Sequence, residues 1–267
     1  MLGDNVRASI RAYANQLFIK YPAFGRRGYD FLRVSGLDRS TRSVRKHFRK
    51  LAQQGFYPQV IVDVGANHGG WSREAASVYD SARFFLIEPQ VEMRPFLDRF
   101  CAQVEGSRWF AGGAGAKAGH MDLTVWDDYQ GSAFLSPDVE SMVPELRQRQ
   151  VPVFTLDQLI GSGELPMPDL IKIDVQGYEM EVLQGCMRCY GKTDMFIVET
   201  SLFHPLDQRP SFYRVLELME AYGYAVYDLL DFKYRGDGAL AQIDVCFLRK
   251  QSPLALKLRG RKKKAEG

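Results

Sequence analysis

Residues 59–70 read QVIVDVGANHGG, a short apolar run that ends in a turn rich in glycine. A run of this length without polar alternation is typical of a strand buried on both faces of a parallel sheet. Small residues after such a strand let the chain turn into a helix and leave room for a ligand at the helix start. The stretch therefore predicts the first strand and the ligand-binding turn of a doubly wound α/β sheet.

The rest of the chain continues this alternation of strands and helices. Strands are predicted at residues 82–89, 107–115, 169–175, 194–200, 224–232 and 244–250, and helices at 71–79, 91–104, 178–190 and 211–223. No helix separates the last two strands, so we expect them to pair as an antiparallel hairpin. About seven strands with helices on both faces result, and the last strand runs antiparallel.

Three parts of the chain are expected from its patterning. Residues 1–55 form a basic, helical N-terminal extension, with helices predicted at 5–20 and 40–54. Residues 56–250 form the α/β domain, which carries an insertion at about 115–160 with two strands and a flexible centre at 131–137. Residues 251–267 form a basic tail.

Composition indicates a cytoplasmic protein with reduced thiols. Hydrophobic residues make up 46% of the 267 residues, but no apolar run is long enough to span a bilayer and no signal peptide pattern opens the chain. Four irregularly spaced cysteines do not form a secreted disulfide framework. Cys186 and Cys189 lack a second pair at metal-site spacing, so we expect buried thiols and no metal.

The net charge of +3 is unevenly distributed. Residues 1–50 carry twelve Lys and Arg against three Asp, and residues 249–267 carry eight against one Glu, so the middle is acidic. Basic ends favour peripheral contact with an anionic membrane surface, an acidic glycan or a nucleic acid. The alternative is a solvated helix face and a frayed tail.

The glycine turn disfavours NAD and FAD. Gly65 and Gly70 match two positions of the dinucleotide fingerprint, but Asn67 occupies the middle one and would crowd a pyrophosphate. No Gly-Lys-Ser/Thr follows, which excludes a Walker loop.

Two carboxylates flank this turn and suit a cofactor without phosphates. Asp63 ends the first strand, where it can serve an ammonium group directly or through a backbone amide or water. Glu88 ends the second strand, where an acidic residue accepts both hydroxyls of a ribose. The alternative for either acid is a strand-end side chain that caps the following helix.

These residues resemble the FkbM-type methyltransferase family. The resemblance rests on a first block at 63–69 (DVGANHG), the acid Glu88 and a later block at 170–179 (LIKIDVQGYE), and it extends over about residues 58–250. It implies a class I, Rossmann-like methyltransferase that binds S-adenosyl-L-methionine. The cofactor-binding residues would be Asp63, Gly65, Ala66, Asn67, Gly69 and Glu88.

The resemblance also implies O-methylation of a hydroxyl on a small-molecule or glycan acceptor, such as a sugar, glycolipid or secondary metabolite. Asp174, at the end of the fourth strand, is the first candidate for the proton acceptor. Lys172 on the same strand face and His204 in a later loop complete the catalytic candidates. Substrate-binding candidates are Gln176, Glu179 and Glu199; many relatives have Glu where this chain has Gln176.

Two other functions stay open at this point. A nucleic-acid substrate is disfavoured because residues 174–177 read DVQG instead of the Asn/Asp-Pro-Pro-aromatic block of base-amine methyltransferases, and no cysteine suits cytosine C5 chemistry. Ribose methylation of RNA is not excluded. A non-catalytic scaffold that binds membranes or polyanions through its basic ends is the other alternative.

Overall fold

The computed structural model describes residues 44–125, 147–202, 211–235 and 237–265. The helix predicted at 5–20, the centre of the insertion at 131–137 and His204 lie outside these residues.

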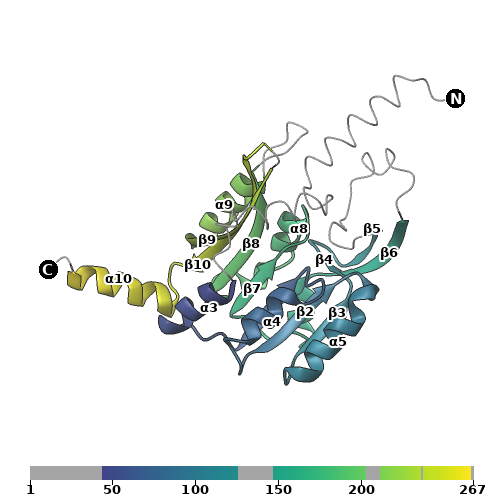
Figure 1. Cartoon of the computed structure of the whole chain (residues 1–267), viewed down its shortest axis with the longest axis horizontal. Coiled ribbons are helices and arrows are strands. Elements are labelled where there is room, and N and C mark those ends of the chain that lie inside the picture. Colours follow the sequence, from purple (N-terminus) through teal and green to yellow (C-terminus); the bar gives the residue numbers. More distant parts are fainter. Residues whose placement is uncertain (1–43, 126–146, 203–210, 236, 266–267) are drawn as a thin grey trace.

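A seven-stranded sheet forms the middle layer of the described chain (Figure 1). Its order is β3-β2-β1-β7-β8-β10-β9. The strands are β1 Val60–Val64, β2 Arg83–Glu88, β3 Arg108–Ala111, β7 Leu170–Ile173, β8 Met195–Ser201, β9 Tyr224–Tyr234 and β10 Leu240–Arg249. β10 pairs antiparallel with β8 and β9, while the pairs among β3, β2, β1, β7 and β8 are parallel. This confirms the predicted class I fold and its antiparallel last strand.

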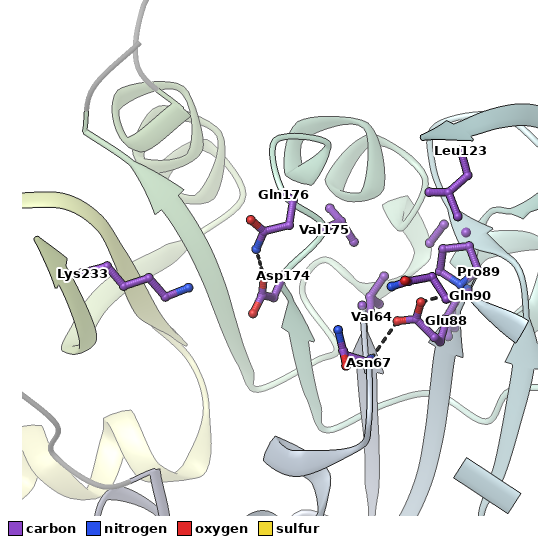
Figure 2. A pocket seen from close by; sticks show the side chains of 14 residues that line it. Val64, Asn67, Glu88, Pro89, Gln90, Leu123, Asp174, Val175, Gln176 and Lys233 are labelled. Carbon is purple, nitrogen blue, oxygen red and sulfur yellow. Dashed lines mark hydrogen bonds between the residues drawn. The ribbon is translucent and has the colours of Figure 1, made fainter. Parts of the chain in front are cut away.

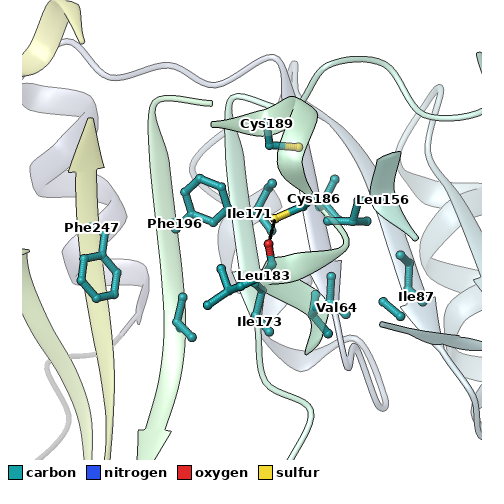
Figure 3. Close-up of a cluster of buried hydrophobic side chains, with 14 of the residues drawn as sticks. Val64, Ile87, Leu156, Ile171, Ile173, Leu183, Cys186, Cys189, Phe196 and Phe247 are labelled. Atoms are coloured by element: carbon teal, nitrogen blue, oxygen red, sulfur yellow. Dashed lines mark hydrogen bonds between the residues drawn. The ribbon is translucent and has the colours of Figure 1, made fainter. Parts of the chain in front are cut away.

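Helices cover both faces of this sheet. One apolar cluster packs α7 (Leu156–Gly161), α8 (Glu179–Gln184) and α9 (Ser211–Ala221) on one face and includes Leu183 and Phe196 (Figure 3). A second cluster packs α3 (Val44–Gln53), α4 (Gly70–Ala76), α5 (Arg94–Gln103) and α10 (Pro253–Ala265) on the other. Successive strand residues alternate between the two clusters, as the pleat of a doubly covered sheet requires.

A second, three-stranded sheet holds the two strands predicted in the insertion. β4 (Gly113–Ala114), β6 (Arg147–Phe154) and β5 (Gly119–Val125) lie in the order β4-β6-β5. The single strand predicted at 107–115 is instead divided into β3 and β4. A Cβ on Gly112, between them, would lie 2.6 Å from both the Pro152 carbonyl oxygen and the Phe154 ring, so glycine allows β6 to approach this division.

The helix predicted at 178–190 is shorter than expected. α8 ends at Gln184, and a separate 3-10 turn, η3, follows at Met187–Cys189. A Cβ on Gly185 would lie 2.0 Å from the Gly115 carbonyl oxygen, so the chain passes the insertion here too closely for any other residue. Both thiols of the Cys-x-x-Cys stretch are free and buried.

Both basic ends of the described chain are packed against the body. α3 buries Phe48 and Leu51, and α10 buries Leu254 and Ala255, in the same apolar cluster. Residues 251–267, expected as a tail, therefore begin as a docked helix. Neither these helices nor any other in the described ranges is long and apolar enough to cross a membrane.

Candidate active site

A cavity of about 240 Å³ opens at the carboxyl ends of β1, β2 and β7. This is close to the lower bound of about 300 Å³ for small-molecule sites. Strand order reverses at β1, which lies between β2 and β7. Figure 2 shows that side chains from both sides of this point face the cavity. Its lining residues are Val64, Gly65, Asn67, Ile87, Glu88, Pro89, Gln90, Gly113, Ala114, Leu123, Asp174, Val175, Gln176 and Lys233.

Gly65 lets the ends of β1 and β7 meet at the floor of the cavity. Its φ is +80°, and a Cβ there would lie 1.8 Å from the carbonyl oxygen of Asp174. The Asp174 N–H in turn donates to the Val64 carbonyl oxygen over 3.0 Å. Any side chain at position 65 would therefore separate the two strands that carry the site.

Glu88 is held at one end of the cavity by two backbone amides. Its Oε2 accepts a 2.7 Å hydrogen bond from the Asn67 N–H, and its Oε1 accepts a 2.9 Å bond from the Gln90 N–H (Figure 2). Asn67 has a φ of 48°, which turns its N–H toward this carboxylate. Burial raises the pKa of Glu88. Each oxygen keeps further acceptor capacity for ligand hydroxyls.

Asp63 lies behind the glycine turn and does not line the cavity. Its side chain is fully buried, and its Oδ2 accepts a 2.6 Å hydrogen bond from Ser72 Oγ at the start of α4. The Lys172 ammonium is 3.9 Å from its Oδ1. Burial raises the pKa of Asp63. Ala66 and Gly69 are also absent from the lining residues, so among the predicted cofactor residues Gly65, Asn67 and Glu88 face the cavity.

Asp174 forms the opposite end of the cavity. Its Oδ2 accepts a 3.0 Å hydrogen bond from Lys172 Nζ, and its Oδ1 accepts a 2.8 Å bond from Gln176 Nε2. Burial acts to raise the pKa of Asp174, but the ammonium groups of Lys172 and Lys233 outweigh it and hold the pKa below its usual range. A quarter of the side chain is exposed, so this carboxylate is charged and accessible from the cavity.

Lys172 lies beneath the cavity and supports Asp174. It is 6% exposed, and it is absent from the lining residues. Burial acts to lower its pKa, but Asp174 and Asp63 outweigh this and raise it. Lys172 therefore contacts Asp174 from outside the cavity, as an ammonium group that keeps its proton.

Gln176 connects Asp174 to Glu199, a buried carboxylate that also accepts a hydrogen bond from Lys233. Gln176 Nε2 also donates to Glu199 Oε2 over 3.0 Å, and Lys233 Nζ donates to Glu199 Oε1. Burial raises the pKa of Glu199 well above its ordinary value. Gln176 and Lys233 line the cavity and Glu199 lies behind them.

Glu179 lies at the N-terminus of α8 and faces the preceding turn. Its Oε1 accepts a 2.8 Å hydrogen bond from the Gly177 N–H, and the residue is 3% exposed. Burial raises the pKa of Glu179 to about 7. Glu179 is not among the residues that line the cavity.

Residues 63–226 match the family model described as the methyltransferase FkbM domain. This chain belongs to the FkbM methyltransferase family. Membership confirms the resemblance seen in the sequence and S-adenosylmethionine as the cofactor. The matched range includes Glu88, Asp174, Gln176 and Glu199, but ends before Lys233.

Two curated relatives match only part of this chain. It is 44% identical over 43 residues to the hexuronic acid methyltransferase AglP of Haloferax volcanii, which is 16% of this chain and 18% of AglP. It is 27% identical over 153 residues to the methyltransferase sdnD of Sordaria araneosa, or 47% of this chain and 59% of sdnD. The chain thus spans less than two thirds of the length of either relative.

Solved structures with a similar fold are distant in sequence. A precorrin-6y C5,15-methyltransferase from Geobacter metallireducens is 14% identical, with a TM-score of 0.43 over 78% of this chain and 92% of that chain. The fibrillarin pre-rRNA processing protein of Methanococcus jannaschii is 14% identical, with a TM-score of 0.45 over 73% of this chain and 67% of that chain.

Gln90, Leu123 and Lys233 are among the cavity-lining residues that the sequence analysis did not predict as site residues. Gln90 follows Glu88 by two positions, so its position after the second strand could have predicted it as a site residue. Leu123 and Lys233 come from β5 and β9 and line the cavity only through tertiary packing. No local pattern distinguishes Lys233 from other lysines in the sequence.

Proposed function

We propose that this FkbM methyltransferase transfers a methyl group to a hydroxyl of a sugar, glycolipid or secondary metabolite. The observation that carries the proposal is a cavity with Glu88 at one end and both Asp174 and Lys233 at the other. The first end suits the ribose of S-adenosylmethionine, and the second suits a hydroxyl that loses a proton. The name of AglP, a hexuronic acid methyltransferase, supports an acceptor of the sugar class.

The residues at the first end fit the cofactor. Glu88 would accept hydrogen bonds from the ribose hydroxyls, because amides already fix both of its oxygens. Ile87, Pro89 and Leu123 give the apolar lining that a purine ring needs. Gly65 and Asn67 would adjoin the methionine end, with Asp63, Ala66 and Gly69 shaping the turn from behind.

The second end would bind the acceptor and take up its proton. When bound, the cofactor supplies an electrophilic methyl group for an in-line displacement. Asp174 would accept the hydroxyl proton, and its lowered pKa makes it a weak base, so the proton leaves late, as the new bond forms. Lys172 and Gln176 would fix the carboxylate, while Lys233 would donate to an acceptor oxygen.

The roles of the two ends can be separated by calorimetric titration with S-adenosylmethionine and S-adenosylhomocysteine. Glu88→Gln should weaken binding about 10- to 100-fold, since a hydrogen bond to a charged group contributes about 1.5–3 kcal/mol. Asp174→Asn should leave affinity within about threefold, because its place is at the acceptor end. Glu92→Gln, which removes a carboxylate paired with Arg149 outside the cavity, is the matched control. Unchanged affinity in Glu88→Gln would refute the cofactor placement.

Acceptor chemistry is tested by radiolabelled methyl transfer to a panel of hexoses, hexuronic acids and glycolipids. For an acceptor found in this way, Asp174→Asn should lower kcat by about 100-fold or more, as expected for loss of a proton acceptor. Lys233→Met should mainly raise KM, and Lys233→Arg, which keeps the positive charge, should raise KM less. Full turnover of Asp174→Asn would contradict the proposed base.

A further inference from the structure

The exposed side of α3 is basic along its whole length. Arg45, Lys46, Arg49 and Lys50 are exposed, while His47, Phe48 and Leu51 are buried against the body. The helix sequence VRKHFRKLAQ contains no acidic residue. The apolar stripe of this amphipathic helix is thus used for packing, and its charged stripe faces solvent.

α10 extends this basic side although it lies at the other end of the chain. Lys257 Nζ donates a 2.8 Å hydrogen bond to the carbonyl oxygen of Gln54, just after α3. Lys257 and Arg259 are exposed, and the helix sequence PLALKLRGRKKKA also contains no acidic residue. Figure 1 shows α3 and α10 adjacent at one end of the molecule. We name the exposed residues Lys46, Arg49, Lys50, Lys257 and Arg259 the α3–α10 face.

Little of this charge is neutralised by the protein. Lys50 Nζ lies 3.8 Å from Asp228 Oδ2. Within the part of the chain that the structure describes, Lys46, Arg49, Lys257 and Arg259 form no ion pair. A surface that carries several unpaired cations attracts anionic surfaces.

Two exposed apolar side chains are close in sequence to this face. Leu256, next to Lys257, is 51% exposed, and Tyr57, three residues after Gln54, is 63% exposed. Basic residues interleaved with aliphatic and aromatic side chains are typical of proteins that lie in the interface of a membrane. Free anions or RNA phosphates would satisfy the charge but would leave Leu256 without an apolar partner.

We propose that the α3–α10 face docks this protein on the surface of an anionic lipid membrane. The basic side chains contact lipid headgroups, and Leu256 and Tyr57 enter the boundary between headgroups and acyl chains. This inference does not depend on the proposed reaction, since it rests on a surface formed by α3 and α10.

Sedimentation of the full-length protein with vesicles tests the proposal. Binding should occur with phosphatidylcholine mixed with phosphatidylserine, be absent with phosphatidylcholine alone and weaken as salt is raised. Each basic residue near an anionic surface contributes about fivefold to partitioning, so Lys46→Ala/Arg49→Ala should lower it about 25-fold. Arg259→Ala should lower it by about a further fivefold.

A matched control removes the same charge elsewhere. Arg99→Ala/Lys117→Ala deletes two exposed basic residues on α5 and between β4 and β5, away from α3 and α10 in Figure 1. Its partitioning should stay within about twofold of the unmodified protein. Equal loss in both double variants, or absence of binding to anionic vesicles, would overturn the proposal. Matching thermal unfolding curves show that each variant is folded.

Leu256→Ser distinguishes a membrane from other polyanions. It should weaken binding to anionic vesicles and leave any binding to a poly-uridylate oligonucleotide unchanged. RNA binding that exceeds vesicle binding at equal salt, or vesicle binding unaffected by Leu256→Ser, would contradict docking in a lipid interface.

Discussion

At the scale of single residues, Gly65 is the position that tolerates least change. Gly65→Ala places a Cβ 1.8 Å from the Asp174 carbonyl oxygen at a φ of +80°. We expect a loss of about 3 kcal/mol in the free energy of unfolding and loss of cofactor binding, because β1 and β7 must separate. Urea denaturation checks the first and calorimetry the second.

Gly70→Ala is the control for this substitution. A Cβ at Gly70, the first residue of α4, meets nothing within 4 Å. Alanine is the better helix former by up to about 1 kcal/mol, so this variant should be as stable as the unmodified protein or slightly more so. If both variants lost stability equally, the close approach of β7 would not be the cause.

At the scale of secondary-structure elements, the buried Glu179 at the N-terminus of α8 should make stability depend on pH. Burial raises the pKa of Glu179 to about 7, whereas an unfolded chain has a glutamate pKa of about 4.3. Between these values the folded state binds a proton that the unfolded state has lost. The free energy of unfolding should therefore fall as pH rises from about 4.3 to about 7, by about 4 kcal/mol for this group.

Glu179→Gln should reduce this slope in urea denaturation across that pH range. Part of the slope should persist, because burial also raises the pKa of Asp244 to about 7. Glu181→Gln, a partly exposed acid on the same helix, controls for the loss of one carboxyl group. If Glu179→Gln left the slope unchanged, a group other than Glu179 would cause the pH dependence.

At the scale of the whole molecule, the two ends of the chain stabilise the body together. Leu254 of α10 is 4% exposed and belongs to the cluster that contains Phe48 and Leu51 of α3. Leu254→Ala should cost about 2–3 kcal/mol in the free energy of unfolding, through lost apolar burial and the cavity left behind. Leu256→Ala, at a position 51% exposed, should change it by about 0.5 kcal/mol or less. Similar losses from both would mean that α10 does not pack as described.

Local patterns were sufficient for the framework of the site. Alternating strands and helices indicated the doubly wound sheet, and the ends of three strands located the glycine turn, Glu88 and Asp174. Each of these residues is placed by its own strand, because the carboxyl ends of parallel strands meet at one edge of a sheet. Sequence alone therefore determined the fold class, the cofactor and the two carboxylates that face the cavity.

Tertiary structure decided which side chains act together. Gln176 joins Asp174 to Glu199, 23 residues later than Gln176, and Lys233 reaches the same carboxylate from β9. The sequence predicted Asp63 and Glu179 as ligand-binding residues, but neither lines the cavity. In the folded chain Asp63 accepts a hydrogen bond from Ser72, and Glu179 accepts one from the Gly177 amide. The meeting of α3 and α10, joined by a bond between residues 203 positions apart, also has no local signal. Such contacts depend on strand register and helix packing, which only the folded chain fixes.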